Sequence, residues 1–320
     1  MEGNFMEKKL GLVTRDAYGQ ALLELGRANP KIVVLDGDLS ASTKTNLFAK
    51  EFPDRFYNVG IAEANLVGLA GGLAQGGKIP FISSFACFMV CRAYDQLRMA
   101  VAVPHQNVKV VTSHGGISVG EDGASQQSIE DVALMVALPG FIVAVPSDEH
   151  CTRALVKQAA QIKGPVYIRT GRPKAPLVHE ASASFTFGKG VLLRKGKDVT
   201  LVANGLMVFE ALWAAEELER SGLSCSVIDM HTVKPLDEDL LIAQAEASGA
   251  VVTAEEHQVW GGLGSAVASA LSRKHPVPVE LVGIQDTYAE SGKPDELLEK
   301  YGLTGRHIAE AARRAIQRKR

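Results

Sequence analysis

Short apolar runs alternate with longer amphipathic stretches along most of the chain. In the first half, apolar runs of strand length cover residues 31–35, 79–83, 108–112, 141–145 and 166–169. Segments whose apolar residues recur with helical spacing lie among them, at 16–27, 62–75, 92–101, 129–138 and 148–162. Strands that alternate with amphipathic helices indicate a parallel sheet covered by helices.

A second series of the same kind follows a break in the pattern. Pro and Gly cluster at 171–176, a polar stretch runs on to Ser184, and this segment is the best candidate for a linker. Beyond it, strands are expected at 199–203, 224–229 and 250–254, and helices at 206–221 and 236–247. We therefore predict two α/β domains, each with a mostly parallel sheet flanked by helices, at 1–176 and 189–320, joined by a linker at 177–188.

Composition narrows the class of protein. Hydrophobic residues make up 46% of the 320 residues and charged residues 22%, which suits a globular chain. The net charge of -2 gives no electrostatic case for nucleic acid or an anionic membrane. No apolar run reaches the roughly 18 residues of a membrane span, and the charged N-terminus has no apolar signal core. The four scattered cysteines suit free thiols in a reducing compartment, so we expect a cytoplasmic protein.

Residues 58–74 contain a single acid, Glu63, among glycines, alanines and other small or apolar residues. A helix of this composition lets another backbone come close, so the carboxyl is expected to be poorly solvated and to seek a nitrogen partner. The alternative is a tightly packed core helix whose first turn Glu63 caps.

Other candidates follow the predicted strands, where sites in α/β sheets gather. Asp36, Gly37 and Asp38 precede a run of hydroxyl residues, which alone is also typical of a turn that caps a helix. Phe85 and Phe88 are three apart and could form a flat apolar slot for a ring, or belong to the core.

Polar groups are denser in the second half of the first domain. The loop 112–127 holds four glycines, His114 and Asp122, which favours a functional loop in which His114 donates to a substrate oxygen and Asp122 accepts from a hydroxyl. Arg169 and Arg172 could bind a phosphate or form an interdomain ion pair. The glycines at 261–264 follow Glu255 and Glu256 but lack dinucleotide-binding spacing, so a packing turn or subunit contact is expected.

The order of these pieces resembles the C-terminal half of transketolase, a thiamine diphosphate enzyme, from about Val13 onward. The resemblance rests on the ordered segments 36–38, 58–63, 85–88, 120–127, 168–173 and 256–264. It implies a pyrimidine-binding domain followed by a transketolase C-terminal domain.

The resemblance also assigns roles to matching residues. Glu63 would hydrogen-bond the aminopyrimidine of thiamine diphosphate and promote its imino tautomer. The other cofactor-binding positions would be Asp38, Phe85 and Phe88, and the substrate-binding positions would be Arg15, Ser42, His114, Asp122, Gln126 and Arg172. Gln126 stands where many family members have histidine, and an amide cannot shuttle a proton near pH 7.

The diphosphate and Mg²⁺ site of the family has no counterpart in this sequence, which contains no Gly-Asp-Gly. Since the start of the chain looks native, we expect an N-terminal partner subunit that carries the Mg²⁺ ligands, in an α2β2 assembly. The implied activity is transfer of a two-carbon ketol unit from a ketose phosphate to an aldose phosphate.

Three alternatives stay open. Two share the fold: a 1-deoxyxylulose-5-phosphate synthase, or the β subunit of a 2-oxo acid dehydrogenase, which usually has a His-Ser-Gln type loop where residues 124–127 read Ala-Ser-Gln-Gln. The third, of another class, is a non-catalytic regulatory or scaffold protein that kept the fold.

Overall fold

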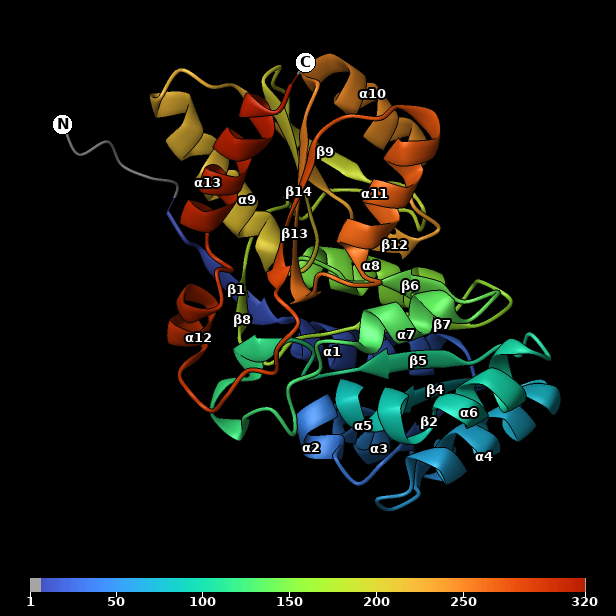
Figure 1. Ribbon diagram of the computed structural model, residues 1–320. Helices are drawn as coiled ribbons and strands as arrows, with labels where there is room; N and C mark the ends of the chain where they lie inside the picture. The colour runs from blue at the N-terminus through green and yellow to red at the C-terminus, as the bar shows by residue number, and fades with distance from the viewer. Residues whose placement is uncertain (1–6, 320) are drawn as a thin grey trace.

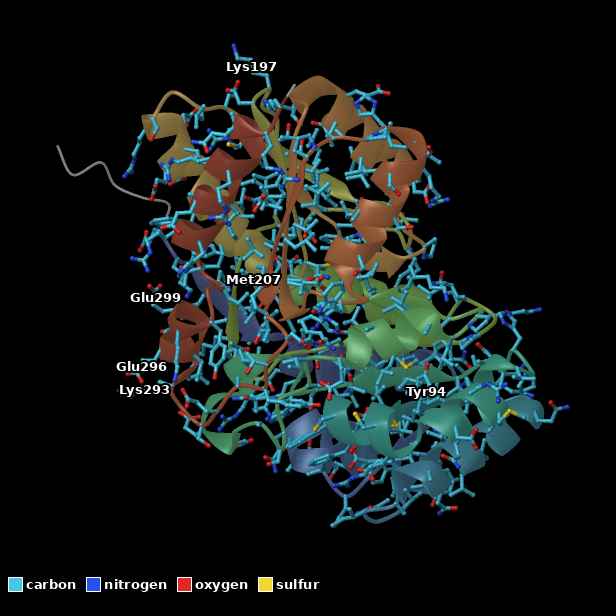
Figure 2. The ribbon with its side chains drawn as sticks, in the orientation of Figure 1. Tyr94, Lys197, Met207, Lys293, Glu296 and Glu299 are labelled. Atoms are coloured by element: carbon cyan, nitrogen blue, oxygen red, sulfur yellow. The ribbon has the colours of Figure 1, made fainter. Side chains whose placement is uncertain are left out.

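The structure is a computed structural model and describes residues 7–319. Two α/β halves lie one above the other in Figure 1, with the N-terminal half (blue to green) below the C-terminal half (yellow to red). Figure 2 shows the buried Met207 at the level where the two halves meet.

The lower half is built on a seven-stranded sheet with the order β12-β6-β7-β5-β4-β2-β3. All neighbours in it are parallel except β12 and β6. Its strands are β2 (Ile32–Asp36), β3 (Phe56–Asn58), β4 (Ile79–Ser83), β5 (Lys109–Thr112), β6 (Ile142–Ala144), β7 (Val166–Arg169) and β12 (Thr232–Lys234).

Helices cover both faces of this sheet, so strands such as β2 and β7 are buried along their whole length. One face packs against α1 (Thr14–Ala28), α3 (Asn46–Glu51) and α8 (Glu149–Ala159). The other packs against α4 (Glu63–Gln75), α5 (Ala86–Arg92) and α7 (Asp131–Ala137). The remaining short pieces are α2 (Ser40–Thr43), α6 (Tyr94–Gln96), a turn of 3-10 helix at Pro53–Arg55, a π-helix at Leu97–Ala102 and a 3-10 segment at Ile117–Asp122.

The upper half is built on a five-stranded sheet with the order β14-β13-β10-β11-β9, in which only β9 runs antiparallel. Its strands are β9 (Val191–Arg194), β10 (Val199–Ala203), β11 (Cys225–Asp229), β13 (Val251–Gln258) and β14 (Val279–Ile284). The helices α9 (Met207–Arg220) and α13 (Gly305–Gln317) cover one face. The helices α10 (Glu238–Ser248) and α11 (Leu263–Lys274) cover the other, and α12 (Pro294–Lys300) lies beside the 3-10 segment.

The two halves share structure at their junction. β12 lies between β11 and α10 in sequence but pairs with β6 of the lower sheet. The Lys234 ammonium donates hydrogen bonds to the carbonyls of Val136 and Leu138 at the end of α7. A separate two-stranded antiparallel sheet pairs β1 (Leu10–Val13) with β8 (Lys174–Pro176), and β8 leads directly into residues 177–188.

The segment 177–188 contains no helix or strand, yet it is tied down at its start. The carboxylate of Asp148 accepts hydrogen bonds from the backbone N–H groups of Val178 and His179. The His179 ring pairs with Asp229 of the upper half at 2.7 Å. The domain limits 1–176 and 189–320 stay a proposal, because strand β12 crosses that division.

The predicted fold class, two α/β domains with mostly parallel sheets flanked by helices, is confirmed. Most predicted elements lie within two residues of observed ones, but the helix expected at 92–101 was wrong in form. Helix α5 ends at Arg92, and the chain continues as a single turn and a π-helix. Among residues 7–319, no helix is both long and apolar enough to cross a membrane.

Candidate functional site

The ends of β2, β4, β5 and β7 meet at one edge of the lower sheet, because these strands are parallel and adjacent. An isolated parallel bridge between Phe85 and Ser113 extends the β4–β5 contact beyond the strands. It brings the aromatic segment after β4 against the glycine-rich loop after β5. This edge collects most of the residues that the sequence singled out.

Glu63 is the first residue of α4, and only 2% of it is exposed. The Ser84 hydroxyl donates a hydrogen bond to its Oε1 at 3.0 Å. The Arg92 guanidinium lies 3.3 Å from Oε2 and 3.5 Å from Oε1, and it is the nitrogen partner that the sequence led us to expect. Glu63 is also the acid of the first turn of α4, a position that the helix dipole favours, so the helix-terminus alternative describes its place as well.

Three rings form a stack that Arg92 joins to this carboxyl, because its guanidinium faces Glu63 and lies over the Phe88 ring. The Phe85 and Phe88 rings lie 5.5 Å apart between centroids with an angle of 21° between their planes. The His114 ring lies 3.7 Å from Phe85 at the same angle. Phe85 is buried and Phe88 is half-buried, so the stack presents a flat apolar wall.

His114 is neutral in this setting. Burial, with the nearby guanidiniums of Arg15 and Arg172, lowers the pKa of His114 to about 3. Arg15 Nη1 lies 3.4 Å from His114 Nε2, and since a guanidinium can only donate, Nε2 is the acceptor. The proton therefore sits on Nδ1, which donates to the Ser113 hydroxyl at 2.9 Å. Donation from Nε2 to a substrate oxygen would require the other tautomer, after Arg15 turns away.

The two arginines that follow β7 have different surroundings. Arg172 is one-third exposed and bonds the carbonyl of Val119 and the carboxylate of Glu121. Arg169 is 4% exposed and donates to the carbonyls of Ser128 and, at 2.7 Å, Glu256 of the upper half. Arg169 thus crosses between the halves through a backbone carbonyl, while its ion pair, at 3.5 Å, is with Asp131 of the lower half and not the interdomain pair that the sequence left open. Of the two arginines, Arg172 is the one that remains available to a phosphate.

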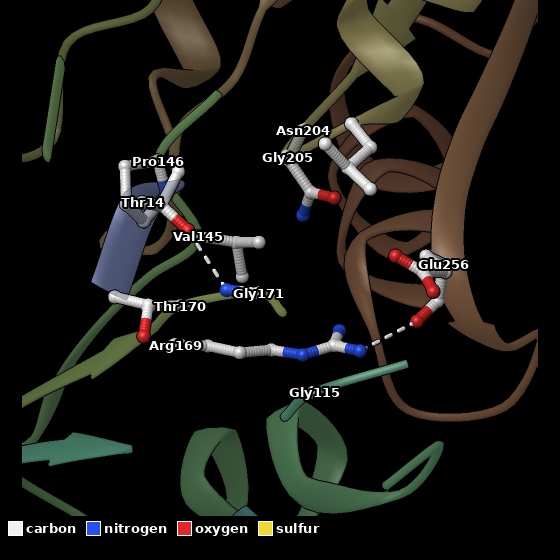
Figure 3. Close-up of a pocket in the computed structure, with 11 residues that line it drawn as sticks. Thr14, Gly115, Val145, Pro146, Arg169, Thr170, Gly171, Asn204, Gly205 and Glu256 are labelled. Carbon is white, nitrogen blue, oxygen red and sulfur yellow. Dashed lines mark hydrogen bonds between the residues drawn. The ribbon is translucent and has the colours of Figure 1, made fainter. Parts of the chain in front are cut away.

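Figure 3 shows this interdomain contact around a small cavity between the halves. The guanidinium of Arg169 reaches across to Glu256, and the backbone N–H of Gly171 donates to the Thr14 hydroxyl at 2.8 Å. The adjacent Glu255 accepts the N–H groups of Leu263 and Gly264 at 2.8 Å each, where α11 begins. The glycine-rich segment 261–264 is therefore a packing turn.

The remaining sequence candidates lie around the same edge. Asp38 is exposed, has φ 66°, and accepts a hydrogen bond from the Asn58 amide at 2.8 Å. Ser42 is half-buried in α2. Asp122 is exposed and close enough to act electrostatically on Arg15. The Gln126 side chain accepts from the Ser125 hydroxyl, and its backbone carbonyl faces the Cys87 thiol at 3.4 Å.

The described residues fit the aminopyrimidine end of thiamine diphosphate. A shielded carboxylate stands beside a flat aromatic wall, which suits a planar ring with in-plane nitrogens. Because Phe85 and Phe88 stack on each other, such a ring would lie against the wall and not between them. Among residues 7–319 no group of three or more His, Cys, Asp or Glu side chains could hold a metal ion.

Sequence reasoning missed the residues that partner the candidates. Ser84 and Arg92 both bond Glu63, and Glu121 holds Arg172. Arg92 carries one detectable signal, since it follows Phe88 by one helical turn and its guanidinium carbon lies 4.1 Å from the Phe88 ring centroid.

Comparison with known proteins identifies the family of the chain. Residues 11–177 match the family model of the transketolase pyrimidine-binding domain, and residues 188–308 match that of the transketolase C-terminal domain. A protein of Methanocaldococcus jannaschii described as a transketolase C-terminal section is 46% identical over 92% of this chain and 93% of its own length. A 6-deoxy-6-sulfo-D-fructose transketolase subunit of Clostridium sp. (strain MSTE9) is 45% identical over 95% of each chain.

Longer relatives and a solved structure complete the comparison. Human transketolase is 41% identical over 95% of this chain, which spans 49% of the human protein. A structure titled as a split-gene transketolase, an inactive beta4 tetramer, superposes with a TM-score of 0.91 and 54% identity, covering 97% of this chain and 100% of its own. The chain therefore belongs to the transketolase family and corresponds to its pyrimidine-binding and C-terminal domains.

Proposed function

We propose that this chain is the C-terminal subunit of a transketolase, a transferase that moves a two-carbon ketol unit from a ketose phosphate to an aldose phosphate. The observation that carries the proposal is the shielded carboxylate of Glu63 beside the wall of Phe85 and Phe88. The family match supports the reaction class, and the free thiols of the four cysteines suit a cytoplasmic setting.

Thiamine diphosphate, when bound, supplies the electron sink that carbon–carbon bond cleavage and formation need. The chain would hold its aminopyrimidine end. Glu63 would hold or move a proton at the ring nitrogen, while Ser84 keeps the carboxyl in place. Phe85 and Phe88 would contact the ring face and exclude water, and Asp38 would approach from the β2 turn.

The polar cluster beside the ring stack would bind the sugar. Arg15 and Arg172 put two positive charges next to a neutral His114, which suits a terminal phosphate. Ser42, Asp122 and Gln126 would contact the phosphate or the sugar hydroxyls. A sulfonate offers similar oxygens, and the Clostridium relative is described as acting on a sulfo sugar, so the assay should include both kinds of substrate.

Diphosphate and Mg²⁺ would be bound by an N-terminal subunit. The chain spans 49% of human transketolase, and no Gly-Asp-Gly occurs in it. Two exposed features of α4 are available for assembly: Gly68 and Gly72 have open space where a side chain would be, and Leu69 is 46% exposed. We propose an α2β2 complex in which each site is completed by the partner.

The test is to reconstitute the chain with the N-terminal partner, thiamine diphosphate and Mg²⁺, and to assay ketol transfer with Glu63 and with Glu63→Gln. The variant keeps the shape of the side chain but cannot exchange a proton, so kcat should fall by about 10²-fold or more. A kcat near wild type for Glu63→Gln would refute the role of Glu63.

The same assay separates the alternatives. Carbon dioxide release from pyruvate would favour a 1-deoxyxylulose-5-phosphate synthase or a 2-oxo acid dehydrogenase subunit. Failure of every reconstituted complex to bind thiamine diphosphate would favour a non-catalytic protein.

A further inference from the structure

Arg92 makes two contacts within the candidate site. The guanidinium carbon lies 4.1 Å from the centroid of the Phe88 ring. The same guanidinium faces both carboxylate oxygens of Glu63 through Nη1, at 3.3 and 3.5 Å. Arg92 therefore spans the aromatic wall and the shielded acid.

These two contacts are the ones that the proposed function assigns to the aminopyrimidine of the cofactor. A guanidinium is planar and delocalised, stacks on aromatic faces and carries its N–H donors in the plane. An aminopyrimidine is likewise planar, with a ring nitrogen and an amino group at its edge. The guanidinium of Arg92 and the aminopyrimidine therefore cannot bond Glu63 and cover Phe88 at the same time.

We propose that Arg92 is a stand-in for the aminopyrimidine: its guanidinium occupies the Glu63–Phe88 site until the cofactor arrives and is then displaced. This inference rests on the proposed function and adds a residue that controls access to the site.

The structure makes Arg92 the member that moves. Its side chain is 49% exposed, whereas that of Glu63 is 2% exposed. Arg92 is the last residue of α5, and Ala93 leaves helical geometry with φ -120° and ψ 22°. The Ser84 hydroxyl bonds Glu63 independently, so the carboxyl keeps its position when the arginine leaves.

The exchange has a proton balance. Beside Arg92, the Glu63 carboxylate faces a permanent cation. Beside the ring nitrogen, the pair formed by Glu63 and the ring holds one proton between them, and that proton comes from solvent. Cofactor binding should therefore be linked to proton uptake.

The experiment measures thiamine diphosphate binding to the reconstituted complex by titration calorimetry at pH 7, in two buffers of different ionisation enthalpy. Arg92→Met keeps an apolar stem on Phe88 but removes the cation, and Arg92→Gln is a second variant without charge. Arg92→Lys is the matched control, because it retains a cation for Glu63. Thermal unfolding of each chain identifies a variant that fails to fold.

Arg92→Met and Arg92→Gln should bind the cofactor about fivefold more tightly, since a competing half-exposed ion pair is gone. Arg92→Lys should stay within about twofold of wild type.

Equal or weaker binding by folded Arg92→Met and Arg92→Gln, while the wild type binds, would overturn the inference and leave the proposed function standing. Absence of binding by the wild-type complex would instead refute the proposed function itself.

Discussion

Lys109 is a buried ionisable side chain of the lower domain that is held by backbone carbonyls and not by an opposite charge. Lys109 is fully buried, and its ammonium donates to the carbonyls of Ile162 at 2.8 Å and Gly164 at 2.6 Å. Burial lowers the pKa of Lys109 to about 7. It lies at the start of β5 and His114 lies beyond its end, so the same strand carries a shifted group at each end.

The His114 ring should stay neutral through the physiological range. With a pKa of about 3, its ring resonances in a ¹H–¹³C correlation spectrum should not titrate between pH 5 and 8. His114→Gln assigns the resonances by their disappearance. A midpoint between pH 6 and 7 for that ring would contradict the burial and the guanidinium field on which the expectation depends.

Lys109 should make unfolding depend on pH. Between about pH 7 and 10.5 the unfolded chain binds more protons at this residue than the folded chain, so the free energy of unfolding should rise with pH. The slope approaches about 1.4 kcal/mol per pH unit within that window. Urea unfolding at pH 7, 8 and 9 measures it, and Lys109→Met should remove this part of the slope. An unchanged slope in the variant would mean that Lys109 keeps an ordinary pKa.

The composition of residues 58–74 was enough to single out Glu63, and positions after strands were enough for Phe85, Phe88 and His114. Their partners were beyond sequence reasoning. Arg92 is 29 positions from Glu63, and their contact depends on how α4 and α5 pack on the sheet. The tautomer of His114 likewise depends on Arg15, which belongs to a different helix.

At the scale of elements, β13 links the two domains through its polar end. Glu255, Glu256 and His257 would ordinarily end a strand, yet all three are buried there. Glu256 accepts from the Ser118 backbone and from Arg169, both in the lower half. A side chain on Gly116 would collide with Glu256, and φ is +86° there, so only glycine suits the loop at this point.

Substitution of Arg169 should mainly lower stability, whereas substitution of Arg172 should mainly weaken substrate binding. Arg169→Gln removes one partner from a buried set of charges and carbonyls, so the free energy of unfolding should fall by about 3–5 kcal/mol. Arg172→Gln removes an exposed ion pair and should cost about 1 kcal/mol or less.

For substrate binding, the larger effect should come from the loss of Arg172. In the reconstituted complex, Arg172→Gln should raise KM for a sugar phosphate by about tenfold with little change in kcat. Equal stability losses for the two variants in urea unfolding would contradict the division of roles between them.

Short, mostly apolar runs predicted their elements best: residues 79–83 and 166–169 are strands β4 and β7 as expected. At β13 the polar residues after 254 led to an expected strand that ended too early. The end of this strand is buried by contacts from the other domain, which the local sequence does not show. The helical pattern of 92–101 could not reveal the break at Ala93 or the π-helix after it.

At the scale of the molecule, the lower sheet should depend on the upper half. A fragment of residues 1–188 lacks β12 and the Lys234 contacts that close the end of α7, and it leaves β6 as an open edge. Expressed alone, it should aggregate or unfold without a cooperative transition, as measured by sedimentation and thermal unfolding.

Co-expression with residues 189–320 is the control for that fragment. The two pieces should reassemble, because the paired strands and the His179–Asp229 contact do not require a continuous chain at position 188. A monomeric fragment 1–188 that unfolds cooperatively by itself would contradict this dependence.

The contacts of the three-residue strand β12 also limit how related genes can recombine. A crossover between two related genes within 177–188 would set the β6 edge and the α7 carbonyls of one parent against Thr232–Lys234 of the other. Such hybrids would survive only where both parents agree on register and on a lysine at the end of the strand. Recombination within this family should therefore pass the two domains on together, as a single inherited block.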